Sequence, residues 1–342
     1  MKIAITSLYL PRGSKIGVGY QVHFLANQLV ARGHSVTVFS QFEASNDALY
    51  DVKRVVPRQQ LSTFGFAWDL RSVDFGGFDV LNAHGDDWFL WGRERPRHIH
   101  TFHGSCFAEM LHATSAIGRM RMGLLAACEY SVCFLPDELV AVSENTRRFI
   151  PSVRHVIPCG VNLDEFFPGE KSERPSLLFV GTMGGRKRGR MLLELFKNAI
   201  QPNVKDCEFW AVCEEKVEGK GVRWFGRLPG RQLAELYRRA WVFCLPSTYE
   251  GFGVPYIEAM ASGTAVVASP NFGAREVTQE GRHGLLALDS EMAALLISVL
   301  TDVRLRERLE KAGIDRAQSF RWDSVCTQYE VLYENQCEGV LI

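Results

Sequence analysis

The sequence predicts an α/β protein built from two doubly wound domains, and three observations lead to that prediction. The chain has 342 residues, more than one hydrophobic core usually holds. Short apolar segments alternate with helix-like amphipathic segments in both halves, as in parallel sheets covered by helices. Between the halves, residues 156–162 (VIPCGVN) carry the proline and glycine typical of a crossing between domains.

The first half is predicted to form an N-terminal domain over residues 1–157. It begins with an apolar strand at 2–5, a glycine-containing loop and an amphipathic helix at 21–31 that ends at Gly33. Ser143 stands where it would cap a helix at 144–150. Further strands are predicted at 35–40, 79–82, 97–102 and 139–142.

The same alternation starts again in a C-terminal domain expected at residues 158–320. Its predicted strands are 177–180, 208–212, 222–225, 242–245 and 265–268, and its predicted helices are 191–198, 232–240 and 255–261. A last amphipathic segment at 322–335 carries Val325, Tyr329, Leu332 and Tyr333 on one face. We expect that segment to be a closing helix within residues 321–342.

Composition excludes several classes of protein. The hydrophobic fraction of 46% and the charged fraction of 23% are those of an ordered globular chain. Because 39 basic residues balance 39 acidic ones, no nucleic-acid partner is expected. Nine cysteines without a CxxC pair indicate reduced thiols. With no secretory leader at residues 1–11 and no apolar run of membrane-spanning length, we expect a cytoplasmic protein.

Two open parallel sheets bind ligands at the carboxyl ends of their strands, so we expect the site in a cleft between the domains. The first candidate loop carries Gly17 and Gly19 at the start of the first helix, where bare N–H groups could approach an anion. The dinucleotide pattern GxGxxG fails because Val22 stands at its last position. A tight turn without a ligand remains an equal alternative.

The second candidate loop, residues 181–189 (GTMGGRKRG), follows the first strand of the second domain. Arg186 can bind two oxygens of a diphosphate in a fork, and Lys187 supplies a compact positive charge. It is not a Walker loop, because no Gly-Lys-Ser/Thr sequence closes it. A solvated basic turn is the alternative.

The third candidate segment, residues 246–263 (PSTYEGFGVPYIEAMASG), points most strongly to a ligand. Glu250 stands at a strand exit, a Gly251-Phe252-Gly253 turn follows, and Glu258 comes eight positions later in a helix. Two carboxylates spaced in this way could hold a polyhydroxylated ligand at two points. The alternative makes Glu250 a helix cap and Glu258 a surface acid, although Glu258 lies within an apolar helix.

The fourth candidate is a pair of strand exits in the first domain. His84 and Asp86 follow one strand, and His103 follows another. Strand alternation places His98 and His100 on one face and His103 on the other, so we expect no metal site here.

These motifs, in this order, resemble the GT-B retaining glycosyltransferases, specifically glycosyltransferase family four, over essentially the whole chain. The similarity rests on the early glycine loop, His103 in Thr-Phe-His-Gly, the Val142-Ser143 pair, the crossing at 157–161, the loop with Arg186 and Lys187, and Glu250 and Glu258 followed by Ala-Met-Ala-x-Gly. The resemblance implies two Rossmann-like domains facing each other across a cleft, with the last helix packing back toward the N-terminal domain.

The resemblance also implies transfer of a sugar from a nucleoside-diphosphate sugar to a carbohydrate or glycoside hydroxyl, with retained configuration, no cofactor and no metal. On that basis His103, Glu250, Arg186 and Lys187 form the catalytic set. Donor binding would also use Gly17, Gly19, Gly251, Phe252, Gly253, Val254 and Glu258, and His84 and Asp86 are the candidates on the acceptor side. One departure is Thr182, where many relatives have an arginine, so the phosphate role passes to Arg186.

Two further readings stay open. Another GT-B activity, such as a nucleotide-sugar epimerase or a phosphorylase, would share the phosphate site, and a non-catalytic nucleotide-sugar-binding protein is the alternative outside enzymes. The acceptor is expected to be set by loops at 43–74 and 105–121. Arg119 and Arg121 with Met120, Met122, Leu124 and Leu125 could form a helix on a membrane surface, but a packed helix with two exposed arginines is favoured.

Overall fold

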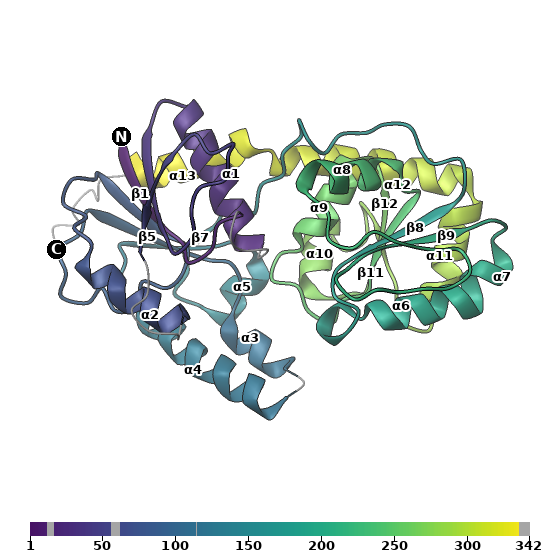
Figure 1. The fold of residues 1–342 in the computed structure, drawn as a ribbon, viewed down its shortest axis with the longest axis horizontal. Helices are drawn as coiled ribbons and strands as arrows, with labels where there is room; N and C mark the ends of the chain where they lie inside the picture. The colour runs from purple at the N-terminus through teal and green to yellow at the C-terminus, as the bar shows by residue number, and fades with distance from the viewer. Residues whose placement is uncertain (12–16, 56–61, 114, 335–342) are drawn as a thin grey trace. The chain divides into compact units, whose positions relative to one another are not determined.

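The computed structural model describes residues 1–342 except 12–16, 56–61, 114 and 335–342, and it contains two compact units (Figure 1). Unit 1 comprises residues 1–160 and 322–342, and unit 2 comprises residues 161–321. The sequence placed these divisions after residues 157 and 320. Each unit is an α/β fold with a parallel sheet, which is the predicted fold class.

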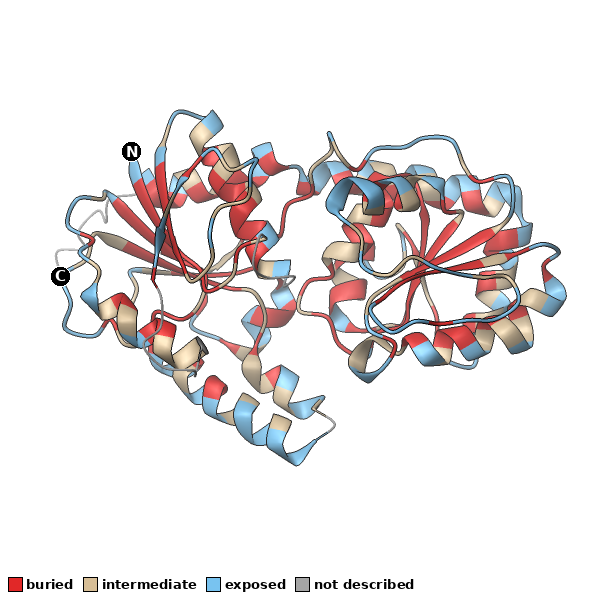
Figure 2. Ribbon diagram, in the orientation of Figure 1, coloured by how far each residue is buried: buried red, intermediate tan, exposed pale blue. Residues whose placement is uncertain are grey.

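Unit 1 contains a seven-stranded parallel sheet in the order β3-β2-β1-β4-β5-β6-β7. The order reverses beside β1, so the carboxyl ends of β1 and β4 border the position where open sheets bind ligands. Figure 2 shows that the inner strands of this sheet are largely buried, as expected for apolar segments covered by helices, whereas three of the four residues of the edge strand β3 are exposed. The strands are β1 (Lys2–Thr6), β2 (Ser35–Ser40), β3 (Asp51–Arg54), β4 (Val80–Ala83), β5 (Arg97–Phe102), β6 (Glu138–Ala141) and β7 (His155–Val156).

The helices of unit 1 agree with the sequence analysis where caps and periodicity were clear. Ser143 caps α5, and its hydroxyl accepts a hydrogen bond of 3.0 Å from the Thr146 N–H. Residues 43–74 and 105–121, which were expected to be loops, instead contain β3, α2, α3 and the start of α4. The helices are α1 (Gly17–Ala31), α2 (Ser62–Asp69), α3 (Cys106–Leu111), α4 (Ala116–Val132), α5 (Glu144–Phe149) and α13 (Trp322–Glu334).

The closing helix α13 belongs to the core of unit 1, as predicted. Val325, Tyr329, Leu332 and Tyr333 are buried in the same apolar cluster as the inner face of α1. The crossing segment passes the first residue of this helix at Gly160, where a Cβ atom would lie only 2.4 Å from the Trp322 ring. A glycine is therefore required for the crossing segment to pass that ring.

Unit 2 contains a six-stranded parallel sheet in the order β10-β9-β8-β11-β12-β13. Its strands are β8 (Ser176–Val180), β9 (Glu208–Val212), β10 (Val222–Trp224), β11 (Val242–Leu245), β12 (Ala265–Ala268) and β13 (Leu285–Leu286). Its helices are α6 (Gly189–Leu195), α7 (Gln201–Asn203), α8 (Gly230–Arg239), α9 (Val254–Ala261), α10 (Phe272–Thr278), α11 (Met292–Thr301) and α12 (Val303–Ala317).

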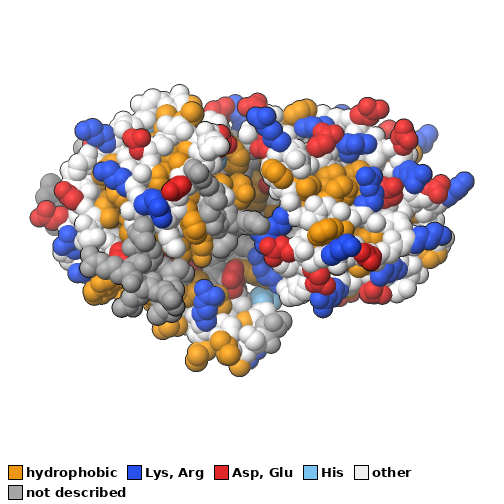
Figure 3. All heavy atoms as spheres, in the orientation of Figure 1, with side chains coloured by type: hydrophobic (Ala, Val, Ile, Leu, Met, Phe, Trp, Pro, Cys, Tyr) orange, Lys and Arg blue, Asp and Glu red, His pale blue; other side chains and the backbone are white. Residues whose placement is uncertain are grey.

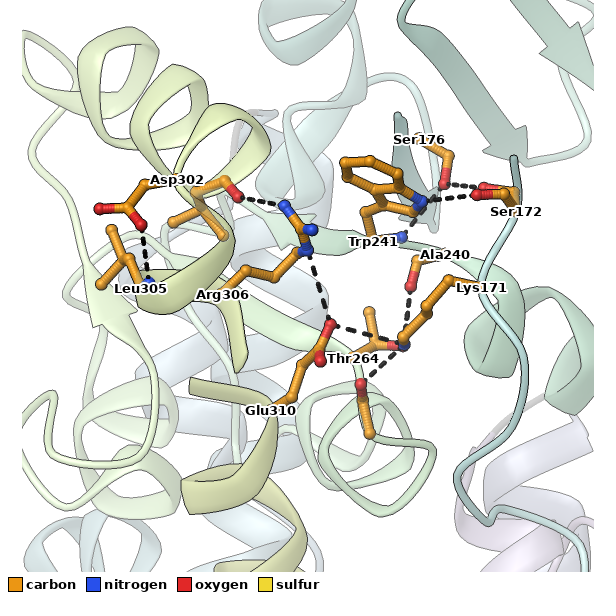
Figure 4. A network of polar contacts seen from close by, with 12 residues as sticks. Lys171, Ser172, Ser176, Ala240, Trp241, Thr264, Asp302, Leu305, Arg306 and Glu310 are labelled. Carbon is orange, nitrogen blue, oxygen red and sulfur yellow. Dashed lines mark hydrogen bonds and ion pairs between the residues drawn. The ribbon is translucent and has the colours of Figure 1, made fainter. Parts of the chain in front are cut away.

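A largely buried lysine fastens the first segment of unit 2 to the helices behind the sheet (Figure 4). Nζ of Lys171 donates to the carbonyls of Arg238, Ala240 and Gly263 at 3.2, 2.9 and 2.7 Å. Burial lowers the pKa of Lys171 to about 8, and Glu310, 3.9 Å from its Nζ, opposes that shift. These bonds satisfy carbonyls at the ends of α8 and α9, so they position the start of β8 and hence the loop that follows it.

Candidate functional site

Two loops of unit 2 bring two cations and a carboxylate together. Nζ of Lys187 lies 2.6 Å from Oε1 of Glu250, and Nη1 of Arg186 lies 3.0 Å from the same oxygen. Arg186 also donates to the carbonyl of Tyr249 at 2.7 Å, and its own carbonyl accepts from the Thr248 N–H at 2.9 Å. The second and third predicted motifs thus form one cluster at the carboxyl ends of the adjacent strands β8 and β11.

The neighbouring Arg188 gives the first of these loops its shape. Arg188 has a left-handed backbone with φ of 53°, and Gly185 has φ of 63°. The Arg188 guanidinium donates to the carbonyl of Pro246 at 2.6 Å, to the Ser269 hydroxyl at 2.7 Å and to both carboxylate oxygens of Asp289. Its charge is therefore engaged in holding three segments together.

Electrostatics keep the cluster ionised. Burial by itself would raise the pKa of Glu250, whose exposed fraction is 5%, but Lys187 and Arg186 outweigh burial and hold that pKa below its usual value. Burial lowers the pKa of Lys187, and the Glu250 carboxylate opposes that shift. Two positive charges and one negative charge leave a net positive charge, which suits an anionic ligand.

The turn after Glu250 is held by packing. Gly253 has φ of 104° and is the N-cap residue of α9, and a Cβ atom there would lie 2.4 Å from the Tyr256 ring. The Phe252 side chain is buried against Phe320, with ring centroids 5.5 Å apart. Phe252 can therefore offer a ligand its backbone but not its ring. Val254, in the first turn of α9, has a backbone N–H at the start of the helix, whereas the next residue, Pro255, has no N–H to donate.

Glu258 lies one turn into α9 and is half-buried. Burial raises its pKa to about 8, and the nearby Glu165 carboxylate adds to the increase. A carboxyl group kept partly protonated in this way can both donate a hydrogen bond to a hydroxyl and accept one. Glu258 is therefore not the fully exposed surface acid of the alternative interpretation.

The early glycine loop belongs to unit 1. Gly17 and Gly19 both lie in the first turn of α1. A Cβ atom on Gly19 would lie 3.0 to 3.1 Å from backbone atoms of Tyr9 and Leu10, whereas one on Gly17 would meet no atom of the described residues within 4 Å. Gly19 thus has a packing role of its own, and its N–H contact with a phosphate stays a prediction.

Two histidines from adjacent strand exits of unit 1 lie in contact. Nδ1 of His84, after β4, is 2.7 Å from Nε2 of His103, after β5. Burial holds the pKa of His84 well below its usual range. Burial and the neighbouring His100 lower the pKa of His103 to about 4. Both rings are therefore neutral near pH 7, and one of them donates to the other.

A buried carboxylate that the sequence analysis did not single out contacts the two other histidines of β5, His98 and His100. Asp87 is fully buried, with its oxygens 2.9 Å from Nε2 of His98 and 2.8 Å from Nδ1 of His100. Burial, together with the charge of Asp87, raises the pKa of the neighbouring Asp86 to about 8. The spacing of His98 and His100, which places both on one face of the strand, was the signal in the sequence that could have pointed to Asp87. A buried pair of imidazoles needs a hydrogen-bond acceptor.

Two family models match the chain, one in each half. The model described as Glycosyltransferase Family 4 matches residues 16–165, and the model described as Glycosyl transferases group 1 matches residues 174–302. The second includes Arg186, Lys187, Glu250 and Glu258. No helix in the described part of the chain is both long and apolar enough to cross a bilayer.

Curated relatives are similar at moderate identity. The O-antigen chain mannosyltransferase B of Escherichia coli is 32% identical over 44% of this chain and 43% of its own length. The phosphatidyl-myo-inositol mannosyltransferase of Mycobacterium leprae is 28% identical over 93% of this chain and 92% of its own length. The first matched relatives, including the one from E. coli, are aligned over only about half of their length, 43% to 58%.

Solved structures share the fold over nearly the whole chain. Sucrose-phosphate synthase from Thermosynechococcus elongatus has a TM-score of 0.80 and 22% identity, covering 97% of this chain and 98% of its own. Anabaena Alr3699/HepE, in a complex with UDP-glucose, has a TM-score of 0.74 and 15% identity, covering 97% and 99%. At these identities the likeness establishes the two-domain α/β architecture.

Proposed function

The chain belongs to the GT-B glycosyltransferases, and on that premise we propose that it transfers a sugar from a nucleoside-diphosphate sugar to an acceptor hydroxyl, with retained configuration and without a required metal. The observation that carries the proposal is the cluster of Arg186, Lys187 and Glu250 at the carboxyl ends of β8 and β11. Relatives named as mannosyltransferases and a fold relative holding UDP-glucose support the choice of substrate class.

In this proposal the two cations bind the donor diphosphate. Cleavage of the bond from the sugar C1 to the diphosphate oxygen increases negative charge on the leaving group. Positioned cations and the N–H groups at the start of α9 stabilise that charge most in the transition state, which is where stabilisation increases the rate. The cluster thereby supplies positive charge that a divalent ion would otherwise provide.

The carboxylates hold the rest of the donor. Glu250 accepts hydrogen bonds from hydroxyls of the transferred sugar, beside the backbone of Gly251, Phe252 and Gly253. Glu258 binds the ribose hydroxyls. In unit 1, Gly17 and Gly19 offer N–H groups to the diphosphate, His103 lies by the reacting face of the sugar, and His84 and Asp86 face the acceptor.

Retention follows most simply from attack on the side of the leaving group. The acceptor oxygen forms a bond to C1 as the bond from C1 to the diphosphate oxygen breaks, and a diphosphate oxygen takes the acceptor proton. A double displacement would need a free carboxylate as nucleophile. In this proposal Glu250 accepts hydrogen bonds from hydroxyls of the transferred sugar and is not the nucleophile, so we favour the first scheme.

Release of free nucleoside diphosphate tests this function. A thermal-shift panel of UDP, GDP, ADP and dTDP with EDTA present identifies the base, because a ligand that binds only the folded state raises the melting temperature. The matching nucleotide sugars are then incubated with and without alkyl glycoside acceptors. We expect diphosphate release that needs an acceptor, persists in EDTA and gives a product with the donor's anomeric configuration.

The alternatives predict other results. An epimerase converts the donor without releasing diphosphate, and a phosphorylase requires inorganic phosphate. A non-catalytic binding protein gives the thermal shift without any turnover. Loss of activity in EDTA, restored by a divalent ion, would contradict metal independence.

A further inference from the structure

The contact between His84 and His103 determines which nitrogen of His103 carries a proton. Nδ1 of His84 lies 2.7 Å from Nε2 of His103, and the two ring centroids are 5.0 Å apart. At this separation one nitrogen must donate a hydrogen bond to the other, because a neutral imidazole has one N–H and one bare acceptor nitrogen. Two arrangements are possible, and they leave His103 in different tautomers.

The surroundings keep both rings neutral. Burial is the main cause that lowers the pKa of each ring, and neighbouring imidazoles lower it further. Among the described residues, the buried Asp87 carboxylate contacts His98 and His100 instead. Histidines contribute little to the surface drawn in Figure 3, in keeping with the burial of His84, His98 and His100. Each ring of the pair therefore has a single proton.

The second nitrogen of His84 distinguishes the two arrangements. Nε2 of His84 is buried and has no hydrogen-bond partner among the described residues. If His103 donated from its Nε2, the single proton of His84 would lie on this nitrogen and would have no acceptor. If His84 donates from Nδ1, its Nε2 is a bare acceptor. Buried N–H groups without an acceptor are rarer in proteins than acceptors without a donor, so the contact favours donation by His84.

The polar residues around the same small hollow support this assignment. Gln21 borders the hollow, but its amide donates to the carbonyl of Gly160 and accepts from the Gly160 N–H. Trp322 also borders the hollow, and its Nε1–H is buried without a partner among the described residues. An indole nitrogen can only donate. A protonated Nε2 on His84 would add a second unpaired donor here, whereas a bare Nε2 is complementary to the indole.

We propose that His84 is a positioning residue that holds His103 in the tautomer protonated at Nδ1. The Nδ1–H of His84 occupies Nε2 of His103, so the Nδ1–H of His103 is the group that remains for a ligand. This assignment places His84 behind His103, in place of its expected contact with the acceptor. Its link to catalysis rests on the proposed function, but the tautomer can be measured in the free protein.

A buried chain of hydrogen bonds fixes the strands that carry the two rings. Asn82 and Thr101 lie two residues before the histidines on β4 and β5. The Thr101 hydroxyl donates to Asn82 at 3.2 Å and lies 3.3 Å from the hydroxyl of Tyr329 on α13. The Asn82 amide donates to the hydroxyl of Tyr333 at 2.8 Å. Helix α13 therefore holds both strand ends in place beneath the histidines.

The segment that follows His103 is also held. The buried carboxylate of Glu129 on α4 accepts a hydrogen bond of 2.9 Å from the Cys106 N–H, three residues after His103. With the backbone fixed on both sides, the freedom left to His103 is rotation of its ring and the choice of tautomer. The bond from His84 restricts both.

The tautomer decides what His103 can do beside a sugar. A bare ring nitrogen facing the reacting groups could take a proton as a general base. An Nδ1–H instead donates to an oxygen of the sugar and cannot accept the acceptor's proton. The assignment therefore agrees with the proposed scheme, in which a diphosphate oxygen takes that proton.

Nitrogen-15 NMR of histidine-labelled protein tests the inference directly. The His103 signals are identified by their absence from the spectrum of His103→Gln. We expect an Nδ1-protonated His103 in the wild type and in His84→Asn, whose amide N–H can replace the Nδ1–H of His84. We expect a mixture of tautomers in His84→Leu, which has no donor at this place. His112→Asn, which replaces an exposed histidine at the end of α3, is the matched control and should leave the His103 signals unchanged.

Kinetics of the same variants measure the link to catalysis. We expect kcat to be reduced at least tenfold in His84→Leu, with donor affinity unchanged, and to be largely recovered in His84→Asn. Thermal melting of each variant verifies its folding. An Nε2-protonated His103 in the wild type, or an unaltered tautomer in His84→Leu, would refute the inference whatever the activity. Mixed tautomers with the kcat of wild type in His84→Leu would overturn the link to catalysis and leave the proposed function standing.

Discussion

Replacement of Lys187 by alanine is the sharpest test of how the unit 2 cluster acts. The Lys187 side chain is 16% exposed, and its Nζ is 2.6 Å from Glu250 Oε1. Because Arg186 contacts the same oxygen at 3.0 Å, Glu250 keeps a partner in the variant and the fold should survive. The effect should therefore appear in turnover more than in stability.

The expected magnitude follows from charge and distance. A unit charge about 4 Å from an ammonium in an environment of effective dielectric constant near 20 gains about 4 kcal/mol. Glu250 offsets part of this, and loss of one preorganised donor in other active sites costs a similar amount. We therefore expect Lys187→Ala to lose about 3 kcal/mol of transition-state stabilisation, about two orders of magnitude in kcat.

The assay is acceptor-dependent release of nucleoside diphosphate at saturating donor. Arg190→Ala is the matched control, because Arg190 lies just beyond the same loop with its side chain 68% exposed and paired to Glu215. Its activity should stay within about twofold of wild type. The same replacement can be made in a protein that already carries Glu250→Gln. If Lys187 contacts the diphosphate directly, Lys187→Ala should cause a large loss of kcat in that protein too. Turnover of Lys187→Ala within about twofold of wild type, with normal melting, would refute the diphosphate role.

Three further predictions concern stability and loop geometry. The pKa of Glu258 is raised to about 8, so the folded state keeps a proton that the unfolded chain loses near pH 4.5. The stabilising contribution of protonated Glu258 is therefore present at low pH and is lost as the pH rises to 8. The free energy of unfolding of Glu258→Gln, relative to that of wild type, should therefore increase by about 2 kcal/mol between pH 5 and 8, as measured by urea unfolding. A difference between the two proteins that does not change with pH would contradict the raised pKa. Gly273→Ala should lower kcat at least tenfold, because its Cβ would lie 2.6 Å from the Phe252 carbonyl oxygen and 2.9 Å from that of Glu250, and normal kinetics would show that this loop tolerates displacement. Gly160→Ala should destabilise unit 1 by about 1–3 kcal/mol through its clash with Trp322. Gly184→Ala should melt as wild type, because its Cβ would meet no atom of the described residues within 4 Å.

The sequence predicted those parts of the fold that have a strong local signal. Apolar strands, the Ser143 cap and the one-sided pattern of residues 322–335 each depend on nearby residues, and the structure confirms them. Segment 105–121 was expected to be an acceptor loop, with a helix only around residues 119–125. It contains α3 and the start of α4, whose outer face is apolar, so polar and apolar residues alternate only weakly along that helix. Segment 43–74 contains β3, of which three of four residues are polar or charged, so it lacks the pattern of a buried strand.

The candidate site was predictable as residue types but not as contacts. Glycines, cations and carboxylates at strand exits identify Arg186, Lys187 and Glu250, because strand ends of a parallel sheet meet along one edge. That both cations would share one carboxylate oxygen depends on Arg186 bonding to Tyr249 and Thr248, which lie more than 60 residues away in the chain. Long-range backbone contacts of this kind leave no pattern in a single sequence.

The shared oxygen changes what the cluster must do when a donor binds. A diphosphate that recruits both cations competes with Glu250 for them, and a buried carboxylate that loses its partners must find others. Hydroxyls of a sugar attached to the same diphosphate would supply those partners. Nucleotide alone offers the cluster the anion without the hydroxyls, so Glu250→Gln should bind nucleoside diphosphate more tightly than wild type does and nucleotide sugar less tightly. Isothermal titration of both ligands into both proteins measures this reversal, and a change of the same sign for the two ligands would separate Glu250 from the sugar.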